Sequence, residues 1–325
     1  MERKGTMFKA KFFSMIRVPN IAISLIAVVA FIVASVFVPY FFSFRNISNI
    51  LISASSTGVM AIGLTFVMIS GGIDLSCPAS LAMSATLGCH IMVTTENVFL
   101  GIIVALGVAT ATGFVNGIAT GIFGMIPMVA TLAVATMCSG FTNWFTQTQT
   151  ITGMPELFHT IFSEKLFGIS SVVYYYFFMI IVSHLVLTKT TFGRSLYAVG
   201  TNQRVAEVNG VDPKKLKIVT YTLAGAIYGL GGMLAAARVG GAGVSLGPQS
   251  NFTDVVTVVV LGGTSVLGGK GSIAGTFIAS IIVAIVSNVM NLVGVGYYFS
   301  LIIKGVIVLV ISFVDVVRYR TQGDG

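Results

Sequence analysis

The sequence predicts an all-α, polytopic membrane protein with about ten transmembrane helices, on three observations. Hydrophobic residues make up 55% of the 325 residues and charged residues only 9%, whereas a soluble domain carries about 25% charged residues. The mean hydropathy is +0.97. Apolar stretches of about 17 to 23 residues, the length that crosses a bilayer as a helix, recur along the chain. These features exclude most classes of soluble enzyme.

The spans can be placed in order along the chain. The first, at 20–40, stays apolar for about 20 residues and is therefore a retained span rather than a cleaved signal peptide. The short stretch at 254–262 spans only with help from the irregular backbone at 262–271, which lipid tolerates where protein or water surrounds it. The remaining spans are predicted at 47–70, 79–95, 98–120, 128–147, 172–188, 218–237, 272–292 and 299–317.

The orientation follows from the basic residues. Fourteen of the 18 Lys and Arg residues fall on one side of the predicted spans, and six of them lie in the connection 189–217. Cytoplasmic loops collect Lys and Arg. We therefore expect a cytoplasmic basic arm at 1–19, a single transmembrane domain at 20–317 and a cytoplasmic tail at 318–325. The net charge of +8 is then a topology signal, and no nucleic-acid partner is expected because aromatic residues do not interleave with the basic ones.

Small residues indicate helix packing rather than chemistry. Gly113, Gly117 and Gly121 repeat at four-residue intervals, and Gly225 and Gly229 do the same. Such faces allow close approach of helix backbones in lipid. The three cysteines lie in or beside apolar segments without C-x-x-C spacing, and the three histidines are scattered. No metal site and no catalytic residue are predicted.

The first polar interruption of the apolar pattern is Asp74, in the sequence GGIDLSCP at 71–78. Paired glycines and a proline end one span there, and Ser76 is expected to cap the next helix. A charge inside a membrane is costly and needs a reason. The structural reading is a capped re-entry turn, and the alternative is a role in gating.

Asp254 and Lys304 form the second interruption, because both fall toward the outer leaflet in the predicted topology. An ion pair between them would offset the cost of two lone charges in lipid. The alternative is that the Lys304 side chain extends to the interface by itself.

Asparagines within predicted spans form the third interruption. Buried amides need hydrogen-bond partners, and uncharged donors and acceptors of this kind also bind hydroxyl-rich solutes. Hydrogen bonds between helices are the alternative use. The candidates for a substrate pathway are Asn116, Asn143, Asn288 and Asn291.

The glycine-rich stretch GGTSVLGGKG at 262–271 invites comparison with a phosphate-binding loop, and the comparison fails. That pattern needs Gly five residues before the Gly-Lys pair and Ser or Thr after it, whereas Thr264 and Gly271 occupy these positions. The chain has no nucleotide-hydrolysing motif of its own. Uphill transport would take its energy from an ion gradient or from a partner ATPase.

The long connection 189–217 contains TFGRSLYAVGTN at 191–202 and a short predicted helix at 203–209. It resembles the coupling segment of membrane subunits of ATP-binding-cassette importers of the ribose type. GIDLS at 72–76 is similar to that family's early motif, and VLGGTS at 260–265 with GGKGS at 268–272 to its late glycine motif. The resemblance covers nearly the whole chain, from about 46 to 315. The coupling residues it implies are Gly193, Arg194, Gly200, Asn202, Val205, Ala206 and Gly210.

The resemblance implies a permease subunit without enzymatic activity, in a bacterial plasma (inner) membrane. Expected partners are a second copy of the chain, a separate ATPase that binds ATP and Mg, and an extracytoplasmic solute-binding protein. The implied solute is a ribose-like pentose or related monosaccharide. Two alternatives stay open: a permease of the same type for another small polar solute, such as a nucleoside or an autoinducer-type sugar derivative, and an ion-coupled secondary carrier.

Overall fold

The computed structural model describes residues 19–247, 249–296, 298–306 and 309, and these are almost entirely helical. α2 (Pro19–Phe37) and α12 (Gln249–Leu261) contain the shorter apolar stretches Ala27–Phe37 and Phe252–Leu261. Seven described helices are long and apolar enough to cross a membrane, by length and composition. They are α3 (Phe44–Ile69), α4 (Cys77–Thr95), α5 (Val98–Gly121), α6 (Pro127–Thr146), α8 (Ser171–Lys189), α11 (Pro213–Val239) and α13 (Ile273–Leu292).

The all-α prediction is therefore confirmed, and nine of the ten predicted spans coincide with helices. The tenth, at 299–317, is helical at 299–306 and 309 and otherwise lies outside the described residues. The predicted terminal arm and tail also lie outside them, apart from Pro19.

Local sequence signals explain where the helices begin. An oxygen-bearing side chain at the N-cap accepts a hydrogen bond from a backbone N–H of the first turn, which would otherwise have no partner. The residues that do so are Ser43, Asn97, Thr190, Asn202, Asp212 and Ser272. Proline occupies the first turn of α4, α6 and α11, where its missing N–H costs nothing.

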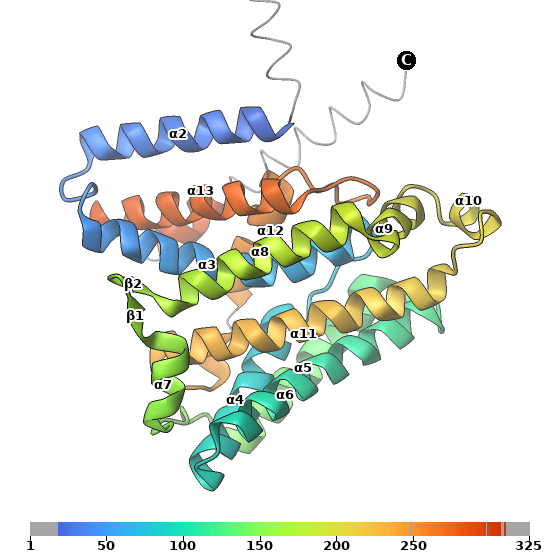
Figure 1. Cartoon of the computed structure of the whole chain (residues 1–325), viewed down its shortest axis with the longest axis horizontal. Coiled ribbons are helices and arrows are strands. Elements are labelled where there is room, and N and C mark those ends of the chain that lie inside the picture. Colours follow the sequence, from blue (N-terminus) through green and yellow to red (C-terminus); the bar gives the residue numbers. More distant parts are fainter. Residues whose placement is uncertain (1–18, 248, 297, 307–308, 310–325) are drawn as a thin grey trace, which may run out of the picture.

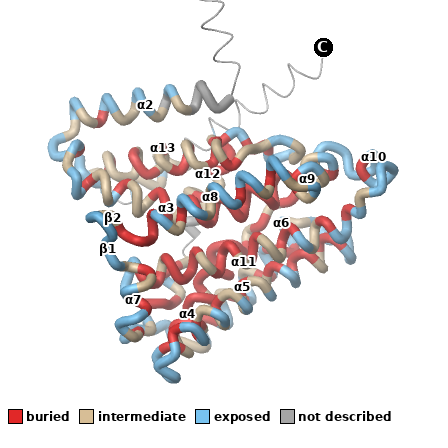
Figure 2. Tube along the Cα trace, in the orientation of Figure 1, coloured by how far each residue is buried: buried red, intermediate tan, exposed pale blue. Residues whose placement is uncertain are grey.

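The helices pack around α3 and α11 (Figure 1). α3 is the most buried candidate span and contacts α8, α11, α12 and α13; α5 runs along α11 and α4, and α2 lies on α13. Figure 2 shows buried residues along α4 and α11 and exposed residues on α2 and α10. The outward faces of α2, α5, α6 and α8 carry exposed large hydrophobic side chains, as expected of surfaces that contact lipid.

The glycine faces of α5 and α11 meet. A Cβ added to Gly113 would lie 3.1 Å from the Cα of Gly225 and would collide with the carbonyl oxygen of Tyr221. Only glycine allows the two backbones this close. The predicted packing role of these glycines is confirmed.

Shorter elements lie at the two ends of the long helices (Figure 1). At one end are α7 (Glu156–Ser163) and an antiparallel hairpin of β1 (Lys165–Leu166) and β2 (Ile169–Ser170), in which Lys165 pairs with Ser170. At the other end are α9 (Thr191–Thr201) and α10 (Gln203–Val208). The sequence predicted α10, but it did not predict α7, the hairpin or α9. The single turn η1 (Val244–Leu246) follows α11.

Candidate functional site

Three segments that are far apart in the sequence meet at the α9–α10 end of the molecule. The N–H of Gly269, in the loop 262–271, donates to the carbonyl of Ile69 at the end of α3 (2.9 Å). The Tyr197 hydroxyl of α9 donates to the carbonyl of Gly271 (2.7 Å), and burial raises the pKa of Tyr197, which keeps it a donor. We call this contact of α3, α9 and the loop the three-motif junction. It joins the coupling segment and the late glycine motif to the chain immediately before the early motif, where a Cβ on Gly268 would lie 2.8 Å from the Cα of Gly71.

Gly200 is the closest point of the three-motif junction. A Cβ at this position would collide with the carbonyl oxygen of Ile69 and lie 2.6 Å from the nitrogen of Gly269. On the loop side, Gly268 and Gly269 have φ angles of +89° and +72°, which glycine adopts without strain. The glycines of this loop therefore serve a tight backbone contact with α9, not the binding of a phosphate.

The predicted coupling residues divide into two groups. Gly193 and Ala206 are buried and Gly200 packs in the three-motif junction. Ala206 therefore supports the chain's own fold and does not face a partner. The exposed members are Arg194, Asn202, Val205 and Gly210.

α10 exposes two valines, of which only Val205 was predicted as a coupling residue. Val205 is 56% exposed and Val208 is 85% exposed. The helix begins at Asn202, whose Oδ1 accepts from the N–H of Val205 (3.0 Å). Val208 was missed because the coupling residues were inferred from the resemblance, although its three-residue spacing from Val205 on the predicted helix already placed the two on one face. Two valines exposed on one short helix form a surface suited to a protein partner.

Asp74 closes a buried turn between α3 and α4. Its Oδ1 accepts hydrogen bonds from the N–H (2.9 Å) and the hydroxyl (2.6 Å) of Ser76. The Asn116 amide of α5 donates to the Ser76 hydroxyl (2.8 Å). Ser76 lies at the N-cap position of α4, as predicted, but its side chain makes no cap hydrogen bond with that helix. Asp74 instead organises the turn, and Asn116 fixes that turn to α5.

The four pathway asparagines do not come together. Asn288 of α13 exchanges two hydrogen bonds with Asn46 of α3, at 2.8 and 3.0 Å. Asn143 donates to the carbonyl of Ser139 within α6 (3.0 Å), and Asn291 is exposed. Asn116 belongs to the Asp74 turn described above. The observed hydrogen bonds of Asn288 correspond to the helix-packing alternative.

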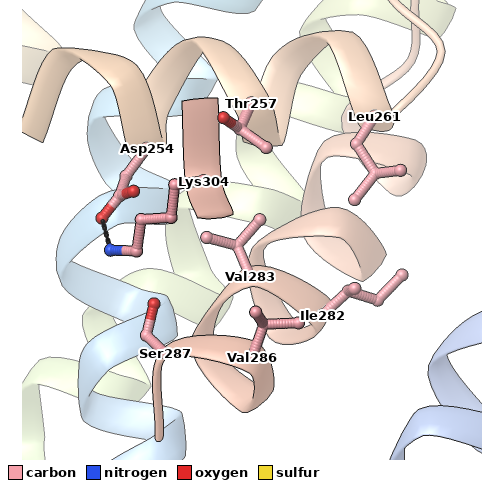
Figure 3. Close-up of a pocket in the computed structure, with 8 residues that line it drawn as sticks. All are labelled: Asp254, Thr257, Leu261, Ile282, Val283, Val286, Ser287 and Lys304. Carbon is pink, nitrogen blue, oxygen red and sulfur yellow. Dashed lines mark hydrogen bonds and ion pairs between the residues drawn. The ribbon is translucent and has the colours of Figure 1, made fainter. Parts of the chain in front are cut away.

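Asp254 and Lys304 form an ion pair with Lys304 Nζ 2.8 Å from Asp254 Oδ2. The side chains are only 18% and 16% exposed, so Lys304 does not extend to an interface alone. Figure 3 shows the two side chains pointing toward each other beside a small cavity of about 30 Å³. The other residues of its wall are Thr257, Leu261, Ile282, Val283, Val286 and Ser287. The mainly apolar wall leaves each charge dependent on the other.

Known proteins resemble this chain over most of its length. The family model described as "Branched-chain amino acid transport system / permease component" matches residues 46–311. The ribose import permease protein RbsC of Bacillus subtilis is 34% identical over 87% of this chain and 88% of its own length. RbsC of Escherichia coli K12 is 33% identical over 90% and 92%. The galactose/methyl galactoside import permease protein MglC of Haemophilus influenzae is 27% identical over 87% and 90%.

No solved structure matches the chain. The matched range, 46–311, contains the early motif, the coupling segment, the late glycine motif and both members of the ion pair. The alignments with the two RbsC proteins, at about one third identity, cover most of this chain and most of each relative. The similarity therefore includes both the spans and the loops that join them. The chain therefore belongs to this family of bacterial membrane permease components and is a permease of the ribose type of ATP-binding-cassette importer.

Proposed function

We propose that the chain is the membrane-spanning subunit of an ATP-driven importer for a ribose-like pentose or a related monosaccharide. In this proposal a separate ATPase, which binds ATP and Mg, drives the transport, and an extracytoplasmic binding protein delivers the solute. Two copies of the chain form the pathway. The names of the relatives, which include ribose and galactose permeases, support a sugar as the solute.

The three-motif junction is the observation that carries the proposal. It joins α9, and through it the exposed α10, to the end of α3 and to the loop between α12 and α13. α3 is the most buried of the candidate spans and contacts both of those helices. A displacement of α10 would therefore be transmitted to the centre of the bundle, because the backbone contacts between these elements are too close to absorb it. Rigid-body tilting of packed helices would then alternate access between the two sides.

The surface charge around α10 supports an acidic partner. The connection 189–217 carries six basic residues and two acidic ones. Arg194, Arg204, Lys214 and Lys215 are all exposed. Complementary charge accelerates association and fixes the register of docking, while the exposed valines of α10 supply apolar contact.

The proposal can be tested by changing the exposed side of α10. We expect Val205→Asp and Val208→Asp to abolish copurification of the full chain with its ATPase and solute-stimulated ATP hydrolysis, because a charge would replace the apolar contact. Ala206→Asp is a poor test, since Ala206 is 3% exposed and the change would damage the fold. Phe167→Asp is the matched control: Phe167 is 97% exposed, in the β1–β2 turn.

We expect the Phe167→Asp chain to retain the ATPase. Retention of the ATPase by both valine variants would refute docking through α10. Solute uptake that continues without any ATPase would instead support an ion-coupled carrier. Uptake of a nucleoside or sugar derivative in preference to D-ribose would keep the coupling proposal and replace the solute.

A further inference from the structure

A larger cavity of about 210 Å³ lies between α3, α11, η1 and α12. It opens near the end of α11 that carries α7, since the Ser163 hydroxyl of α7 donates to the carbonyl of Ala237 (3.0 Å). This is the end opposite α9 and α10 (Figure 1). One water molecule needs about 10–15 Å³ of such volume, which the cavity exceeds more than tenfold. The cavity is therefore large enough to admit a small polar solute.

Three hydroxyl groups of α3 line this cavity without a hydrogen-bond partner in the described part of the chain: those of Ser53, Ser56 and Thr57. Their neighbour Ser55, which is fully buried, donates to the carbonyl of Leu51 (2.7 Å). Many other hydroxyls of the described helices donate to a preceding carbonyl in this way, for example that of Thr65 to Ala61. The three cavity hydroxyls are thus available as donors and as acceptors.

Charged groups of both signs complete the wall. Asp254 lines both this cavity and the small one beside Lys304. Lys304 occupies its Oδ2, while its buried Oδ1 has no hydrogen-bond partner among the described residues. Arg238 lies at the exposed rim and offers guanidinium donors. Because Lys304 neutralises Asp254 and Arg238 lies at the rim, the interior of the wall presents mainly uncharged hydroxyls. Such groups suit an uncharged solute with many hydroxyls.

The rest of the wall is aliphatic and consists of Met60, Ala235, Val239 and Leu246, with Ser245 as a further hydroxyl. Its described residues include no aromatic ring on which a sugar would stack. The cavity therefore combines hydrogen-bonding groups with aliphatic surface and lacks a strong anchor. A transport site must bind a solute well enough to admit it and weakly enough to release it.

We infer that this cavity is a transient binding site for the transported monosaccharide, at the end of the bundle opposite the three-motif junction. The Asp254 carboxylate accepts hydrogen bonds from the hydroxyls of the sugar, and the α3 hydroxyls both donate to them and accept from them. The Asp254–Lys304 ion pair holds the carboxylate in place. The inference rests on the proposed function for its solute, and it replaces the dispersed asparagines as the place where that solute binds.

Thiol labelling tests the inference on the full-length chain in membrane vesicles. Ser56→Cys places a thiol in the cavity, and Ser55→Cys, one residue away and fully buried, is the matched control. A charged methanethiosulfonate reagent is added with or without D-ribose, with glycine betaine as the non-sugar osmolyte, and mass spectrometry reads the modified residue. We expect labelling of Ser56→Cys only, slowed about tenfold by D-ribose at about ten times its Kd. Thr57→Cys repeats the test if Ser56→Cys does not fold.

The outcomes separate the two proposals. No labelling of either cavity cysteine in a folded chain, or the same labelling rate in D-ribose and in betaine, overturns the cavity site. Weaker protection in an Asp254→Asn chain that retains the wild-type circular dichroism spectrum supports it, because the variant removes the carboxylate that accepts from the sugar. Failure of the wild-type chain and its partners to take up D-ribose with ATP overturns the proposed solute, whatever the labelling shows.

Discussion

The ion pair between Asp254 and Lys304 makes a quantitative prediction. At 2.8 Å the attraction between unit charges is about 6 kcal/mol for an effective dielectric constant of about 20. Removing one partner leaves the other charge largely buried and uncompensated, which costs about 3–5 kcal/mol. We therefore expect Lys304→Ala and Asp254→Ala each to destabilise the chain strongly. The double variant should lose much less than the sum of the two.

The assay is a double-mutant cycle on the purified chain in detergent, unfolded with SDS and followed by far-UV circular dichroism. The expected coupling free energy is about 2–3 kcal/mol. Lys215 and Asp212 supply a control cycle: they are 3.6 Å apart with side chains 84% and 45% exposed, and solvent screens such a pair. We expect no measurable coupling there. Strictly additive losses at Asp254 and Lys304 would refute the reasoning.

Three further predictions concern packing and capping. Gly200→Ala should separate α9 from α3, lower stability by about 1–3 kcal/mol and speed proteolysis of the connection 189–217; unchanged proteolysis would contradict the close contact. Asn288→Ala should cost about 1–3 kcal/mol in the same SDS assay because it leaves Asn46 short of a partner, whereas replacing both by leucine should cost less. The backbone N–H of Lys215 is the main cause that lowers the pKa of Asp212. The stability that this cap gives to the first turn of α11 should therefore be full above pH about 4 and be lost as the pH falls through the lowered pKa. The loss should appear as faster amide exchange in that turn. The Asp212→Asn variant should not show this pH dependence.

Several features of the fold could be predicted because they depend on neighbouring residues. Hydropathy over about 20 residues located the spans. Glycines spaced four residues apart, at 113, 117 and 121 and at 225 and 229, indicated close helix packing. α9 was missed although its signals are local. Thr190 caps it, and its buried residues Leu196 and Val199 are three apart, but glycines and charges concealed the pattern.

The candidate site depended more on tertiary structure. The sequence supplied the three motifs, and packing alone brought Gly200 against Ile69 and Gly269. It also gave Asn288 a partner 242 positions away in the chain.

The sequence by itself determined a multispanning helical permease, because the bilayer fixes the length and polarity of each helix through local composition. Only the tertiary structure decided that Ala206 is buried, that Lys304 pairs with Asp254, and that the free hydroxyls of α3 face a cavity. Each of these outcomes depends on which side chains of other helices occupy the adjacent space. Helix rotation and packing set that arrangement over long distances in the chain, so no local pattern contains it.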